Sequence, residues 1–183
     1  MIALLAASLA LAGETVPLQP GVPYAAGARV EAAELGVSFA VPARWKGQLP
    51  PGADVMLLGS DTEAGIVLVS AEPGQALATT QAALSEPMPI DMMTILQPAG
   101  PPEVSGQTLR QHYTHATLVG YARAKVLERS TIVFLAVGPA SESERVAKLA
   151  DTLLASVRAV AAPQTQKVAA KPPSGALAQS LKG

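Results

Sequence analysis

Three apolar runs of strand length, at residues 54–59, 65–70 and 131–137, constrain the fold of this chain more than any other feature. Each run is apolar at consecutive positions, and a strand with this pattern is covered on both faces. The polar stretch 60–64 separates the first two runs and predicts a hairpin in the middle of a sheet. We therefore expect one sheet with other elements packed against both of its sides.

The remaining strand-like segments indicate antiparallel pairing. Residues 30–35 and 37–41 resemble two short extended pieces, and residues 107–117 and 118–128 precede the third apolar run with only short links. A parallel partner needs a crossover of about a dozen residues or more, so short links favour antiparallel neighbours.

Helical periodicity is clearest over residues 141–157. Ser141 and Glu144 have the spacing of a capping box at its start. One face of this helix is apolar and is expected to pack on the sheet. Its members are Val146, Leu149, Ala150, Leu153, Leu154 and Val157.

A shorter helix is predicted over residues 75–85, between Pro73-Gly74 and Pro87. Prolines interrupt every periodic window of residues 86–106, where residues 90–96 are expected to form one or two helical turns.

The chain has 183 residues, of which 49% are hydrophobic and 15% charged, enough for one packed core. We expect an extended leader at 13–29, a single α+β domain at 30–160 with an antiparallel sheet flanked by helices, and a disordered tail rich in Ala, Pro and Lys at 161–183.

Residues 1–12 form an apolar run that ends in Ala10-Leu11-Ala12, the small-x-small pattern that a signal peptidase recognises. The run is too short to span a bilayer, and no Lys or Arg precedes it. We interpret it as an export signal, which places the mature protein in the periplasm or outside the cell. The alternative is a buried helix of a cytoplasmic protein. The absence of cysteine excludes lipoprotein attachment and disulfides.

Residues 36–45 begin with a glycine and an apolar strand, followed by a proline, two residues and Trp45. This pattern resembles the opening of the Mog1/PsbP-like family, and residues 131–137 with 148–158 resemble the family's last strand and closing helix. The resemblance covers roughly residues 30–160. It implies an α/β/α sandwich and an accessory or adaptor role, without a catalytic motif to carry over.

Composition and motifs argue against several function classes. The 13 basic and 14 acidic residues give a net charge of −1, which removes the main argument for a nucleic-acid partner. The chain contains neither a Gly-x-Ser-x-Gly elbow nor a phosphate-binding glycine loop. No catalytic, cofactor-binding or metal-binding residue is therefore assigned.

The two histidines are His112 and His115. Three residues apart on a strand, they point to opposite faces and cannot bind one metal ion together. We accordingly predict ordinary strand histidines.

Four other side chains could meet a partner. Trp45 could anchor an interface, but we expect it to cover one end of the core. Tyr121, Arg123 and Lys125 share one strand face, which could meet an acidic partner and which we expect to be solvated.

The sequence thus favours a non-catalytic, exported accessory domain that binds a protein partner. The first alternative is a chaperone or carrier that shields a hydrophobic segment or a small apolar ligand. The second is a hydrolase whose site is built from loops, in which His112 or His115 would meet a carboxylate.

Overall fold

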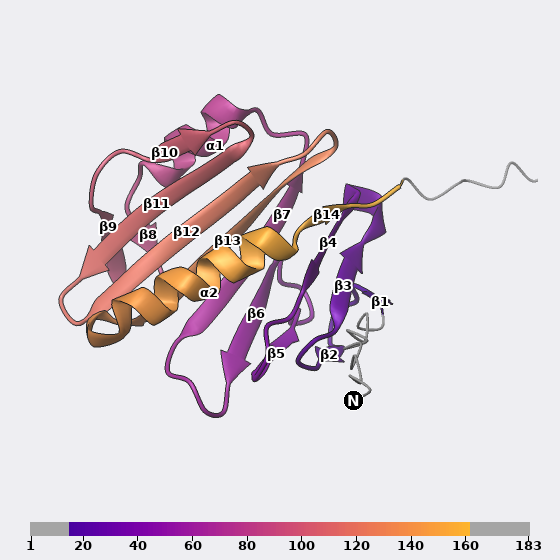
Figure 1. Cartoon of the computed structure of the whole chain (residues 1–183), viewed down its shortest axis with the longest axis horizontal. Coiled ribbons are helices and arrows are strands. Elements are labelled where there is room, and N and C mark those ends of the chain that lie inside the picture. Colours follow the sequence, from indigo (N-terminus) through magenta and orange to yellow (C-terminus); the bar gives the residue numbers. More distant parts are fainter. Residues whose placement is uncertain (1–14, 162–183) are drawn as a thin grey trace, which may run out of the picture.

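The computed structural model describes residues 15–161, and within them a large antiparallel sheet forms the centre of the fold (Figure 1). Its strands in spatial order are β2 (Pro23–Tyr24), β5 (Trp45–Gln48), β6 (Val55–Ser60), β7 (Ile66–Pro73), β13 (Ser130–Pro139), β12 (Leu118–Val126), β11 (Thr108–His115), β9 (Ile95–Pro98) and β8 (Met88–Pro89). The strand β10 (Glu103–Ser105) also pairs with β11.

A smaller sheet packs against one face of the large one. Its strands in spatial order are β1 (Thr15–Pro17), β3 (Arg29–Ala32), β4 (Val37–Ala40) and β14 (Arg158–Ala159). A 3₁₀ turn, η1 (Ala33–Leu35), joins β3 to β4 and ends at Gly36, whose φ of +67° suits a glycine. The antiparallel pairing of β14 with β4 brings the end of the described chain beside its N-terminal strands.

The helix α2 (Ser143–Ser156) covers the same face of the large sheet as the small sheet does (Figure 1). Val146, Leu149, Ala150 and Leu153 are buried in this layer, as the helical periodicity predicted. The core is also held by Phe39 of β4, whose ring meets that of Phe134 edge to face at 5.4 Å.

The opposite face is covered by α1 (Leu77–Leu84), which lies within the helix predicted at residues 75–85. Leu84 packs there with Leu109, Tyr113 and Leu135 in a second apolar cluster. Since β13 has Phe134 in one cluster and Leu135 in the other, it is covered on both faces as predicted. The fold class, an α+β domain with an antiparallel sheet between helices, is therefore confirmed.

Several local expectations were wrong. The strand β6 was expected to be covered on both faces, but its buried residues alternate and Leu57 is 38% exposed. No helical turns form over residues 90–96, where the chain instead makes the hairpin of β8 and β9. The capping box is also absent, because Ser141 lies in a preceding 3₁₀ turn, η2 (Ala140–Glu142), and no side chain caps α2.

Within the segment expected to form a leader, β1 and β2 pair with the small and the large sheet respectively. In the described residues, paired structure thus starts at Thr15, ahead of the domain boundary expected at residue 30. The export signal expected at residues 1–12 and the tail from residue 162 onwards lie outside the described residues.

Candidate functional site

The two histidines lie on β11 and take no part in a shared site. The imidazole of His112 stacks on the Tyr121 ring, with centroids 4.7 Å apart and planes 6° apart. Because side chains alternate along a strand, His115 faces the other side of the sheet, as predicted. Among residues 15–161, no three His, Cys, Asp or Glu residues form a group that could hold a metal ion.

The face of β12 that carries Tyr121 and Arg123 was expected to be solvated, and this expectation was wrong for Arg123. Its side chain is 7% exposed, and Nε donates to Oδ1 of Asp151 on α2 at 2.7 Å. Tyr121 is half-buried, and its hydroxyl lies 2.6 Å from Oγ of Ser143. These contacts fasten the helix to the sheet.

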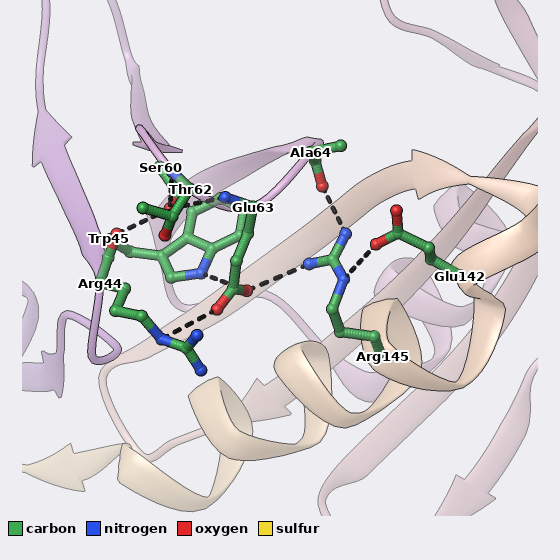
Figure 2. A network of polar contacts seen from close by, with 8 residues as sticks. All are labelled: Arg44, Trp45, Ser60, Thr62, Glu63, Ala64, Glu142 and Arg145. Carbon is green, nitrogen blue, oxygen red and sulfur yellow. Dashed lines mark hydrogen bonds and ion pairs between the residues drawn. The ribbon is translucent and has the colours of Figure 1, made fainter.

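Trp45 is buried at 1% exposure and belongs to the core, as predicted. Figure 2 shows its indole beside Glu63, where Nε1 donates to Oε2 at 3.2 Å. The same carboxylate forms ion pairs with Arg145 at 3.1 Å and with Arg44 at 3.3 Å. Trp45 is therefore not exposed as an interface anchor, and Glu63 acts as a junction between β5, the β6–β7 loop and α2.

The second half of this network ties the start of α2 to the β6–β7 loop (Figure 2). Arg145 pairs with Glu142 at 2.5 Å and donates to the carbonyl oxygen of Ala64 at 2.5 Å. At the other end, Ser60 Oγ donates to the carbonyl of Arg44, whose backbone has a φ of +67°. Each of the four charged side chains forms an ion pair within the network, which therefore stabilises the fold.

The tip of the β8–β9 hairpin is the most conspicuous apolar surface of the described residues. Met92 and Met93 are 102% and 91% exposed, and Ile95 is 46% exposed. Large apolar side chains on a protruding loop often mark a site of protein interaction. The predictions from sequence missed these residues because the prolines of the segment obscure its strands.

Asp91 closes the hairpin tip. Its Oδ1 accepts hydrogen bonds from the backbone N–H groups of Met93 and Thr94, each at 2.8 Å, and the N–H of Ile90 donates to the carbonyl of Thr94. The bond from Met93 is the main reason that the pKa of Asp91 lies below its ordinary value. An Asp ahead of two apolar residues is a turn signal that could have identified this tip from sequence.

A second candidate is an apolar cavity of about 230 Å³ between the two sheets. Phe39 and Val37 of the small sheet line it on one side, and Met56, Val69 and Ile132 of the large sheet line it on the other. The space is open towards solvent beside the exposed Asp54, and its mostly apolar walls suit a hydrophobic ligand.

No helix in the described part of the chain has both the length and the apolar character needed to cross a membrane.

No family model matches this chain, and no curated protein matches it in sequence. The solution structure of cyanobacterial PsbP from Synechocystis sp. PCC 6803 is similar with a TM-score of 0.48 and 15% identity, covering 72% of this chain and 91% of that one. A crystal structure from Bacteroides thetaiotaomicron gives a TM-score of 0.39 and 12% identity, and the match spans 69% of this chain and 46% of that one. At 15% and 12% identity, both are structures that this chain resembles, and they assign it to no family.

Proposed function

We propose that this protein is a non-catalytic accessory domain of the cell envelope and that it binds a protein partner through the tip of the β8–β9 hairpin. The observation that carries this proposal is the full exposure of Met92 and Met93. Burying a methionine side chain contributes roughly 1.5 to 3 kcal/mol, so two of them supply a useful part of an association energy. Thioether side chains also adapt readily to the shape of a partner.

The turn that carries these methionines supports the same role. Three hydrogen bonds donated by backbone N–H groups, two of them to the Asp91 carboxylate, brace the tip before a partner arrives. A preformed loop loses less conformational entropy on binding than a flexible one does. The envelope location rests on the export signal expected at residues 1–12 and is tested by mass spectrometry of the mature N-terminus.

Photo-crosslinking in the native cells tests the partner. A photoreactive amino acid is placed at position 92 or, as a control, at Lys148, which is exposed on α2. We expect a discrete protein adduct from position 92 that the control does not give. The adduct should also be lost in a Met93→Ser background and retained in Leu57→Ser, which changes an exposed apolar residue on β6. Adducts to lipid alone, or protein adducts equal at both positions, would contradict the proposal.

A second candidate function is a carrier of a small apolar ligand, favoured by the cavity of about 230 Å³ between the sheets. Engineered apolar cavities of about 150 Å³ bind benzene, so this space is large enough for a one- or two-ring hydrocarbon. Naphthalene should raise the Tm of the full chain, because ligand binding to the native state stabilises it. Ala71→Leu narrows the cavity and should abolish this shift, whereas Ala155→Leu on the exposed side of α2 should not. An unchanged shift in Ala71→Leu would exclude the cavity as the binding site.

A further inference from the structure

A polar cleft of about 480 Å³ lies on the face of the large sheet that also carries α2. Its floor is formed by β11 and β12, and one wall is the β9–β10 connection at residues 99–101. This wall is fixed, because the N–H of Ala99 donates to the carbonyl of His112 at 2.8 Å and Gln111 Nε2 donates to the carbonyl of Gly100 at 2.8 Å. The volume lies in the range of small-molecule sites.

Two guanidinium groups line the cleft and share one carboxylate. Arg123 uses Nε for Asp151 and one terminal nitrogen for the carbonyl of Ala122 at 2.9 Å. The other terminal nitrogen has no hydrogen bond within residues 15–161, and the Arg123 side chain lines the cleft. Nη2 of the Arg110 guanidinium lies 3.6 Å from the same Asp151 oxygen, and this guanidinium makes no hydrogen bond to the described residues. Asp151 thus compensates one of the two positive charges, and the second carboxylate at the cleft, Glu103, forms no ion pair among the described residues.

His112 also lines the cleft. Its Nε2 is buried and has no hydrogen-bond partner among the described residues. The ring also presents a flat surface, because it stacks on Tyr121, over which the Arg123 guanidinium carbon lies at 5.5 Å. Because Nε2 is closed to solvent, the ring offers a ligand its flat surface and not a hydrogen bond.

We propose that this cleft binds a small organic oxyanion, with its carboxylate or phosphate oxygens on Arg110 and Arg123 and its body against the stacked rings of His112 and Tyr121. Guanidinium groups recognise both oxyanions through charge-assisted hydrogen bonds. Glu103, also at the cleft, lies opposite Arg110 in the β10–β11 register and forms no ion pair in the described chain. Its negative charge repels an anion. Removal of the Glu103 charge should therefore strengthen binding, and removal of the Arg110 charge should weaken it.

Titration of the full chain with benzoate and, separately, with inorganic phosphate tests the proposal at low ionic strength. Arg110 is half-exposed, so Arg110→Gln should fold normally and should weaken binding about tenfold through the loss of one charge-assisted hydrogen bond. Glu103→Gln should strengthen binding a few-fold. Lys46→Gln, which removes an exposed cation on β5, is the matched control and should leave the affinity unchanged.

The NMR signal of the Arg123 Nε–H group should shift on binding in the wild-type chain. Tighter binding of benzoate would assign a carboxylate ligand with a flat body, and tighter binding of phosphate would assign a phosphorylated one. Absence of binding by both probes at millimolar concentration would overturn the proposal. Equal weakening by Arg110→Gln and Lys46→Gln would do so too, because it would indicate attraction to the overall charge of the protein.

Discussion

Asp151 of α2 is the counter-ion of Arg123 of β12, with 2.7 Å between Oδ1 and Nε. The arginine side chain is 7% exposed and the aspartate side chain 43%. A guanidinium keeps its charge at all ordinary pH values. The buried positive charge of Arg123 therefore needs the Asp151 carboxylate to compensate it.

Replacement of that carboxylate should therefore destabilise the fold. Asp151→Asn keeps the shape and an acceptor oxygen but removes the charge, and we expect a loss of about 2 kcal/mol, less than for a fully buried pair. Urea unfolding measures it. Glu144→Gln, which changes an exposed acid of the same helix, should change stability by less than about 0.5 kcal/mol. Equal effects of the two substitutions would mean that the pair does not fasten α2 to the sheet.

Gly65 follows the β6–β7 loop with a φ of +121°, and a Cβ there would overlap the backbone carbonyl oxygen of Val137. A backbone atom in a central strand cannot yield, so Gly65→Ala should cost about 3 kcal/mol. Gly59 in β6 is the matched control, since nothing lies within 4 Å of a Cβ at that position. Thermal or urea unfolding of the two variants should separate them clearly, and similar stabilities would argue against the close approach of Gly65 to β13.

Burial raises the pKa of Tyr113 from 10.0 to about 12. Its hydroxyl donates to the carbonyl of Leu84 at 2.7 Å and so joins β11 to α1. The stability that this group contributes is complete below pH 10 and is lost as the pH rises from 10 towards 12. Tyr113→Phe should cost about 1 kcal/mol at about pH 8. The difference from wild type in urea unfolding should shrink at about pH 11, and a constant difference would contradict the raised pKa.

The lowered pKa of Asp91 predicts that the hairpin tip loosens in acid. The stabilising contribution is present above the ordinary value of 3.8 and is lost as the pH falls through the lower pKa of the folded state. Amide exchange, corrected for the intrinsic pH dependence, should show reduced protection of Met93 and Thr94 at acid pH. Asp91→Asn retains an acceptor oxygen that does not titrate, so its protection should not change with pH.

Local sequence patterns predicted those elements whose burial can be recognised from the order of apolar and polar residues within the element itself. The continuous apolar run of β13 indicated coverage on both faces, and the spacing of Val146 to Leu153 indicated one face of α2. The alternation of His112 and His115 followed from strand geometry alone.

The features that the sequence did not predict depend on how distant parts of the chain pack together. Tyr121 and Arg123 have the composition of a solvated face, and their burial depends on where α2 lies, which no local pattern contains. The exposed methionines were missed because the local pattern itself is weak. The strands β8 and β9 are short, contain prolines and lack strand periodicity.

The pairing of β14 with β4 also sets the order in which the molecule can be completed. Arg158 lies opposite Ser38, and the N–H of Val160 donates to the carbonyl of Gly36, across about 120 intervening residues. During synthesis at roughly 5 to 20 residues per second, the edge of β4 stays unpaired until about 120 further residues have been made. An open strand edge can pair with other chains. A chain truncated just before Arg158 would lack β14 and would therefore be prone to self-association, although it would retain nearly all of the core.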